Sequence, residues 1–143
     1  MLKGIPPVIS PELIKILMEM GHGDEIVLAD GNFPAASCAN RLVRCDGHGI
    51  PVLLDAVLRL FPLDYAVENP VALMAVTPGN PYKPDIWDEY VSTIKKYEKT
   101  NNGIEYMERF SFYERAKKAY AIVATGERAR FANMILKKGI ISE

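Results

Sequence analysis

The chain has 143 residues, 49% of them hydrophobic and 24% charged, and this length fits one domain that spans residues 1–143. Its formal net charge of −1 excludes a nucleic-acid binder that depends on a broad basic face. No apolar run reaches the roughly 20 residues that cross a bilayer, and the N-terminus lacks the apolar core of a secretory signal, so we expect a cytoplasmic protein with no membrane partner.

The first predicted helix begins after Ser10 and ends at Gly21. Ser10 is a good N-cap, and Pro11 fits the first helical position. Gly21 can adopt the left-handed conformation that ends many helices. His22 therefore follows the carbonyl end of a helix, where the partial negative charge favours the imidazolium form. It is either a proton donor or only a cap on the helix carbonyls. Apolar residues recur at helical spacing within this segment, at Leu13, Ile16, Leu17 and Met20.

A carboxylate follows the next predicted element, a buried strand over Glu25–Ala29. Ligands of open α/β sheets collect outside the carboxyl ends of strands, which is where Asp30 would lie. Asp30 is otherwise an ordinary turn residue before Gly31. Taken together, His22 and Asp30 predict a small acid/base pair.

The pattern then alternates between helix and strand. We expect a short helix over Pro34–Ala39, a strand over Leu42–Cys45 with a turn at 46–49, a helix over Pro51–Leu60 and a buried strand over Val71–Val76.

Neither the cysteines nor the glycines predict a cofactor. Cys38 and Cys45 are expected to be reduced, because paired cysteines are rare in cytoplasmic proteins. A zinc site formed by both with His48 would lack a fourth ligand, and His48 fits a turn. The chain has no P-loop and no dinucleotide-binding fingerprint, so we expect neither a metal nor a cofactor.

Aromatic residues mark the longest predicted helix, which Asp85 caps and which extends to about Glu98 before a break at residues 100–103. Trp87 and Tyr90 lie on its apolar side. Aromatic residues at this spacing are more typical of packing than of a platform for a sugar, so we interpret both as packing residues.

The last third adds a strand over Glu105–Phe110, a short helix over Phe112–Lys118, and strands over Tyr120–Ala124 and Met134–Lys137. The alternating elements, with no internal repeat or linker, predict a single α/β domain with a mostly buried sheet flanked by helices.

Several blocks of the sequence carry a resemblance to a known family. They are Leu2–Gly4, Ser10–Leu13, Met20–Asp30, Phe33–Pro34, Arg109–Ala116 and Ala124–Ala129. In these blocks the chain resembles the L-fucose mutarotases, which are related to the D-ribose pyranases. The resemblance implies their fold and a cofactor-free isomerase that interconverts the α and β anomers of a free monosaccharide. L-fucose is the sugar that the resemblance favours. It also implies a ring-shaped homo-oligomer, a decamer of stacked pentamers, with each site near a subunit boundary.

The resemblance also assigns roles to residues. His22 corresponds to the proton donor, and Asp30, Asp64 and Arg109 correspond to sugar contacts. Opening a pyranose requires a proton on the ring oxygen while another leaves the anomeric hydroxyl. We expect His22 to protonate the ring oxygen, while Asp30 orients His22 or accepts a proton from the sugar. Asp64 and Arg109 would fix the remaining hydroxyls. A further contact segment corresponds to Phe131, Ala132 and Asn133.

One position departs from the family pattern, which usually has a tyrosine where this chain has Phe131. A phenol that would bind the sugar or relay a proton is therefore missing. Tyr113 and Tyr120 are candidate substitutes, although Tyr120 fits a core strand. The missing phenol leaves a non-catalytic sugar-binding or regulatory ring as an alternative.

Arg109 bears on the choice of sugar. Fucose mutarotases have Arg-Phe followed by Phe-Tyr-Glu-Arg, as in Arg109–Arg115, whereas ribose pyranases tend to carry a histidine in this segment. Fucose is therefore favoured, and a ribose-type pyranase is the alternative within the same chemistry. Arg109 is otherwise a surface residue paired with Glu108 or Glu114.

Overall fold

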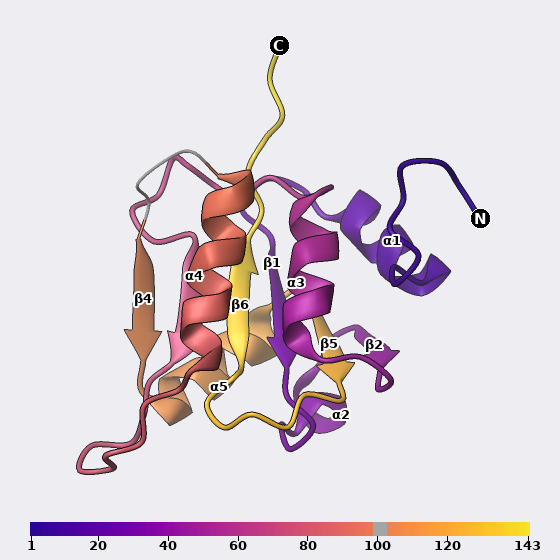
Figure 1. Cartoon of the computed structure of the whole chain (residues 1–143). Coiled ribbons are helices and arrows are strands. Elements are labelled where there is room, and N and C mark those ends of the chain that lie inside the picture. Colours follow the sequence, from indigo (N-terminus) through magenta and orange to yellow (C-terminus); the bar gives the residue numbers. More distant parts are fainter. Residues whose placement is uncertain (99–102) are drawn as a thin grey trace.

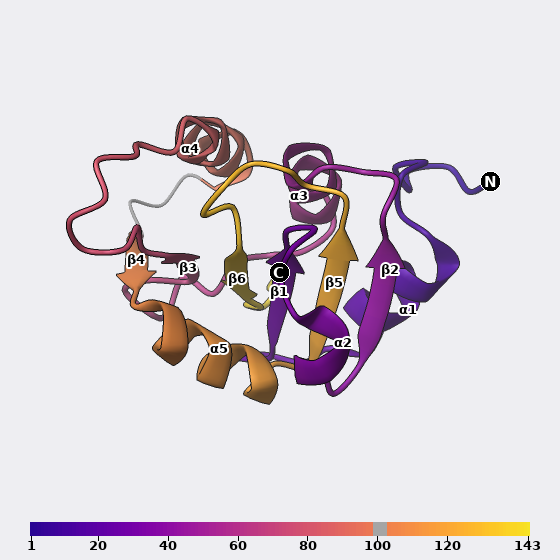
Figure 2. The ribbon, with the colours of Figure 1, turned by 90° about the horizontal axis from the view of Figure 1, so that it is seen from below.

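The computed structural model describes residues 1–98 and 103–143 of the chain. The described residues form one six-stranded sheet between two layers of helices (Figures 1 and 2). The predicted α/β fold with a buried sheet is therefore confirmed. In sequence order the strands are β1 (Glu25–Ala29), β2 (Leu42–Cys45), β3 (Val71–Met74), β4 (Ile104–Met107), β5 (Ala121–Thr125) and β6 (Met134–Lys137). The helices are α1 (Pro11–Glu19), α2 (Ala35–Cys38), α3 (Ile50–Leu58), α4 (Ile86–Tyr97) and α5 (Arg109–Lys118).

The strand order across the sheet is β2-β5-β1-β6-β3-β4. β5 is parallel to β1 and β2, and β4 is parallel to β3, whereas β6 is antiparallel to both β1 and β3. All strands except β6 therefore end at the same side of the sheet (Figure 1). We call this side, where residues 30, 46, 75, 108 and 126 follow their strands, the carboxyl edge, and the opposite side the amino edge.

Alternation along β1 divides the core between the two faces of the sheet. Ile26 and Leu28 pack with residues of α1, α3 and α4, whereas Val27 and Ala29 pack with residues of α2 and α5. All four side chains are fully buried. A strand covered on both faces has no solvated side, which explains why β1 is a nearly continuous apolar run in the sequence.

β4 ends earlier than predicted, and α5 begins earlier. The reason is Glu108, whose carboxylate accepts the N–H groups of Phe110 at 2.9 Å and Ser111 at 3.0 Å and so caps the helix. The strand predicted to continue to Phe110 is therefore wrong beyond Met107. Arg109 is consequently a helical residue at the carboxyl edge.

β3 is also shorter than predicted, because its neighbour β6 begins only at Met134. The last bond between them runs from the Met74 N–H to the Asn133 carbonyl, and residues 75 and 76 belong to the following loop. The other predicted boundaries lie within two residues of those observed. Of the predicted break at 100–103, residues 100–102 lie outside the described residues. The predicted N-cap is confirmed, since the Ser10 hydroxyl oxygen accepts the Leu13 N–H at 3.1 Å.

The end of α1 differs from the prediction. The chain passes into extended backbone at Met20, and the left-handed residue of the turn is Gly23 rather than Gly21. The Lys138 ammonium instead occupies the helix end, where it donates to the carbonyls of Leu17 and Met20. A cation that satisfies these carbonyls removes the need for a glycine cap.

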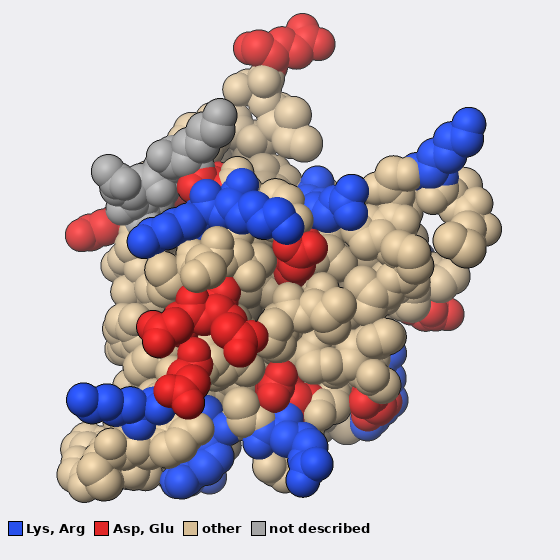
Figure 3. Space-filling view, viewed as in Figure 1, with Lys and Arg blue, Asp and Glu red and all other residues tan. Residues whose placement is uncertain are grey.

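Acidic and basic side chains form separate small groups on the face that carries α3 and α4 (Figure 3). On α4 the acidic Asp88 and Glu89 lie in the first turn, and the basic Lys95 and Lys96 in the last. This arrangement complements the helix dipole. None of the helices in the described residues has the length and apolar character needed to cross a membrane.

Candidate active site

Asp30 is held in place at the carboxyl edge. It comes directly after β1, and Asn133 comes directly before the antiparallel neighbour β6. The Asp30 N–H donates to Asn133 Oδ1 at 2.7 Å, and the Asp30 carboxylate accepts the N–H of Asn32 at 2.9 Å. Burial raises the pKa of the Asp30 carboxyl above its ordinary value, although hydrogen bonds from Asn32, Phe33 and Asn133 act in the other direction. A fixed carboxyl group that retains its proton more readily suits proton exchange with a ligand.

The loop before β6 brings the predicted contact segment to the same edge. Phe131 has a φ of 56°, the only positive φ of a non-glycine residue among the described residues. α4 holds this backbone: the Trp87 indole N–H donates to the Phe131 carbonyl at 2.8 Å, and the Tyr90 hydroxyl donates to the Ala132 carbonyl at 2.7 Å. Within the described part of the chain, the N–H group of Phe131 has no protein acceptor, whereas Ala132 is fully buried. The Phe131 N–H is therefore available to a ligand oxygen.

The loop after β5 supports the turn that follows β1. The Thr125 hydroxyl donates to the Ala29 carbonyl at 2.7 Å, and the Gly31 N–H donates to the Glu127 carbonyl at 2.9 Å. A Cβ at Gly31 would lie 3.2 Å from that same carbonyl oxygen, so the two loops are in close contact. The Glu127 carboxylate in turn accepts the Ile50 N–H at the start of α3, at 3.0 Å. These residues fix the backbone on which Asp30 stands.

Arg109 lies at the carboxyl edge as the first residue of α5 and is exposed. Its Nε donates to the Tyr113 hydroxyl at 3.2 Å, and the Tyr113 ring meets Phe33 edge to face with the centroids 5.2 Å apart. Among the described residues it forms no ion pair with Glu108 or Glu114, which instead cap α5 and contact a lysine. The guanidinium thus presents unpaired donors near the turn that follows Asp30.

His22 lies at the amino edge, in the connection between α1 and β1. Its Nε2 is 3.3 Å from Asp64 Oδ1. The Asp64 side chain is only 7% exposed, and the same oxygen accepts the Ala66 N–H at 3.0 Å, whereas the His22 side chain is 52% exposed. A buried carboxylate therefore holds one ring nitrogen of an imidazole that is open to solvent.

The predicted acid/base pair of His22 and Asp30 is wrong for a single chain. The two residues flank the five residues of β1, which at about 3.3 Å per residue separates them by roughly 16 Å. Asp64 likewise lies beside His22 and away from Asp30. Residues close in sequence are far apart here because an extended strand lies between them.

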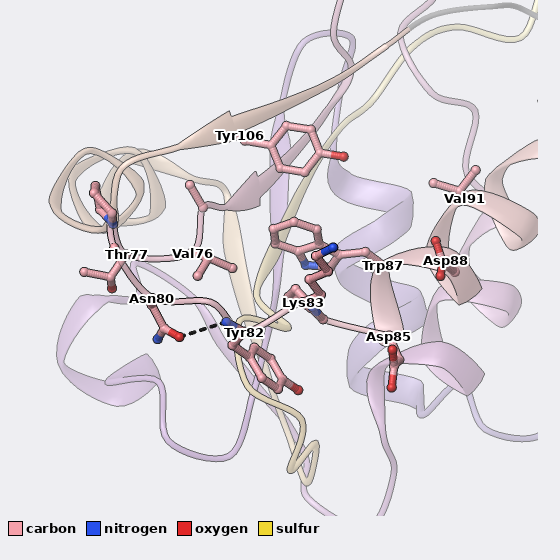
Figure 4. Close-up of a pocket in the computed structure, with 14 residues that line it drawn as sticks. Val76, Thr77, Asn80, Tyr82, Lys83, Asp85, Trp87, Asp88, Val91 and Tyr106 are labelled. Atoms are coloured by element: carbon pink, nitrogen blue, oxygen red, sulfur yellow. Dashed lines mark hydrogen bonds between the residues drawn. The ribbon is translucent and has the colours of Figure 1, made fainter.

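A cavity with a volume of about 770 Å³ lies between the loop that follows β3 and the start of α4. The loop over residues 75–85, the first turns of α4 and Tyr106 of β4 surround it (Figure 4). Trp87 forms part of its wall with Tyr106, at a centroid distance of 5.0 Å. Tyr82, on the same loop, lies 6.0 Å from the Phe131 ring. The cavity and the contact segment thus share Trp87 and Tyr82.

Sequence reasoning missed part of this arrangement. Trp87 and Tyr90 were expected to be packing residues; Tyr90 is fully buried, but both also hold the contact segment, and Trp87 lines the cavity. Tyr82 gave no signal, since it lies in a loop of irregular sequence. Of the two candidate phenols, Tyr120 donates to Glu19 at 3.1 Å next to the amino edge, whereas Tyr113 lies at the carboxyl edge with Arg109.

The described residues contain no group of three or more His, Cys, Asp or Glu side chains able to hold a metal ion. Cys38 and Cys45 are free thiols, and His48 is exposed after β2.

Comparison with known proteins gives full-length matches. Residues 3–141 match the family model described as "RbsD / FucU transport protein family". An L-fucose mutarotase of Actinobacillus pleuropneumoniae is 50% identical over 98% of this chain and 97% of its own length. A fucose mutarotase of Homo sapiens is 50% identical over 99% of this chain and 95% of its own. The crystal structure of a Streptococcus pneumoniae fucose mutarotase in complex with L-fucose superimposes with a TM-score of 0.94 at 56% identity, over 99% of this chain and all of that one.

Proposed function

Because the chain belongs to the RbsD / FucU transport protein family, we propose that it is an isomerase that interconverts the α and β anomers of L-fucose by acid/base-catalysed ring opening and closure. The observation that carries the proposal is the full-length likeness, at 56% identity, to the fucose mutarotase solved with L-fucose. The monosaccharide is the substrate class that this likeness supports, and L-fucose is favoured over D-ribose.

In this proposal the sugar binds at the carboxyl edge. The Asp30 carboxylate accepts the proton of the anomeric hydroxyl, and its raised pKa suits this exchange. The unpaired N–H group of Phe131, the Asn133 amide and the Arg109 guanidinium offer donors to the remaining oxygens of the ring. Each of these groups lies on backbone fixed by the sheet or by a helix, so the sugar meets a preorganised surface.

The proton donor is His22 of a neighbouring copy of the chain. Within one chain His22 stands at the amino edge, so the sugar at Asp30 needs an imidazole from elsewhere. The Asp64 carboxylate holds Nε2, and the half-exposed ring is able to reach across a subunit boundary. A site built from two copies of the chain is compatible with the homodecamer of stacked pentamers that the resemblance implies. We therefore include this ring-shaped homo-oligomer in the proposal. The cytoplasmic location stays a prediction.

The proposed reaction needs one acid and one base. The imidazolium delivers its proton to the ring oxygen while the anomeric hydroxyl gives its proton to Asp30, the bond between C1 and the ring oxygen breaks, and an open-chain aldehyde forms. After rotation about the C1–C2 bond the transfers run in reverse, and closure on the other face of the carbonyl yields the other anomer. Acid/base catalysis of this kind accelerates a reaction by about 10²- to 10⁴-fold.

Anomer exchange measured by NMR tests the proposal. Saturation-transfer spectra of L-fucose and of D-ribose are recorded with and without the protein, and we expect exchange to accelerate for L-fucose and much less for D-ribose. Faster anomer exchange of D-ribose alone would instead indicate a ribose-type pyranase. Binding of L-fucose without faster exchange would leave the non-catalytic sugar-binding ring. Sedimentation velocity of the same sample tests the decamer.

A further inference from the structure

We propose that Trp87 and Tyr90 of α4 are positioning residues that set the conformation of the contact segment Phe131–Asn133 and, through it, of Asp30. This inference rests on the proposed function for its consequence in catalysis, but its structural part stands on contacts within the chain. Neither side chain needs to touch the sugar to act in this way.

The two donors are placed to act together. Trp87 and Tyr90 lie three residues apart on α4 and therefore face the same side of the helix. They bind the carbonyls of two consecutive residues, Phe131 at 2.8 Å and Ala132 at 2.7 Å. The Tyr90 ring and Ala132 are both fully buried, so loss of that hydroxyl would leave a buried carbonyl without its partner.

The segment needs this support because its backbone is unfavourable. Phe131 is held at a φ of 56°, which a phenylalanine rarely adopts without constraint from its surroundings. On its far side the segment is tied to the sheet, since Asn133 accepts the Asp30 N–H with its side chain and the Met74 N–H with its carbonyl. The bonds from α4 therefore keep the loop and the Asp30 backbone in register across the carboxyl edge.

The variants Trp87→Phe and Tyr90→Phe test the proposal, because each removes one donor and keeps an aromatic ring. Tyr97→Phe is the matched control: it lies on the same helix and also loses a hydroxyl, which donates to Asp55 Oδ1 at 2.9 Å, away from the segment. The amide hydrogens of Asp30 and Met74 report on the segment without any sugar. We expect them to exchange about tenfold faster in Trp87→Phe and Tyr90→Phe, and within about twofold of the original rate in Tyr97→Phe.

Catalysis gives a second measurement. We expect Trp87→Phe and Tyr90→Phe to raise the KM for L-fucose about tenfold, with a smaller change in kcat. The reason is that the contact segment would bind the sugar equally in the ground state and in the transition state. Equal exchange of the Asp30 and Met74 amides in all three variants would overturn the proposal. If the unmodified protein does not accelerate the anomer exchange of L-fucose, the proposed function is overturned instead. The amide measurement would still decide the positioning role.

A glycine substitution separates positioning from general destabilisation. Phe131→Gly allows the left-handed backbone without strain, so the segment needs less support from α4. In that background we expect Trp87→Phe to change the Asp30 and Met74 amide exchange by less than about twofold. An undiminished tenfold effect would contradict the positioning role.

Discussion

The two edges of the sheet hold their functional side chains in different ways. At the carboxyl edge Asp30 is partly buried and tied to Asn133, and the loops after β1 and β5 contact each other. At the amino edge Asp64 is buried, whereas the His22 ring that it contacts is half exposed. The residues at the carboxyl edge are fixed by hydrogen bonds, whereas the His22 ring at the amino edge is open to solvent. In the proposed function, each chain supplies the binding surface of one site and the proton donor of another.

Mixed oligomers offer the strongest test of this division. His22→Ala and Asp30→Asn should each lower anomer exchange by about 10²- to 10⁴-fold, because each removes one partner of the proton transfer. When both variants are co-expressed, about a quarter of the interfaces would pair an intact His22 with an intact Asp30, so activity should return to about that fraction. His48→Ala, at the other histidine, is the control. If the mixture stays as inactive as its parts, the site lies within one chain.

Asp64→Asn tests whether Asp64 orients His22 at the amino edge. Asparagine keeps an oxygen for the Ala66 N–H but loses the charged carboxylate that orients the His22 ring. We expect kcat for L-fucose exchange to fall about tenfold or more, with KM nearly unchanged. Asp55→Asn provides the comparison, because that carboxylate pairs with Lys96 on the surface. A rise in KM alone would return Asp64 to the role of a sugar contact.

The pH dependence of Asp30 probes the carboxyl edge. Because its folded pKa is raised, the folded protein keeps this proton to a higher pH than the unfolded chain does. The stability that this group contributes is therefore present at low pH and is lost as pH rises from about 4 through the raised value. Unfolding by urea at several pH values should show this loss for the original protein and not for Asp30→Asn. The proposed anomer exchange needs the ionised Asp30 carboxylate. On acidification it should therefore be lost at a pH above the ordinary pKa of aspartate, which is about 4. A loss of activity only below about pH 4 would contradict the effect of burial on the Asp30 pKa.

Phe131→Tyr is expected to have the smallest effect. It adds the phenol that the family resemblance associates with this position, at the half-exposed ring next to Tyr82. An increase in the exchange rate of a few-fold would show that the phenol assists binding or proton relay. An unchanged rate would mean that this position contributes shape alone, and that Asp30 and its surroundings suffice. Exchange NMR at saturating L-fucose distinguishes the two outcomes.

Local patterns in the sequence determined the elements of this fold to a large extent. β1 and β6 lie where their apolar runs predict them, because a strand buried by its neighbours must be apolar along its length. The α1 N-cap at Ser10 follows from the same kind of short-range chemistry. Errors arose where a distant or competing contact ended an element, as with Glu108 at the start of α5 and Lys138 at the end of α1.

The sequence by itself thus determined the α/β class, the positions of most strands and the set of residues suited to acid/base chemistry. Only the tertiary structure decided which of them meet: Asp30 with Asn133, 103 residues away, His22 with Asp64, and the α4 aromatics with the loop before β6. The physical reason is that helix and strand periodicity depends on neighbours within a few residues, whereas the pairing of strands across the sheet brings together the ends of distant segments. A strand between two residues also keeps them apart, which is why His22 and Asp30 stand at opposite edges.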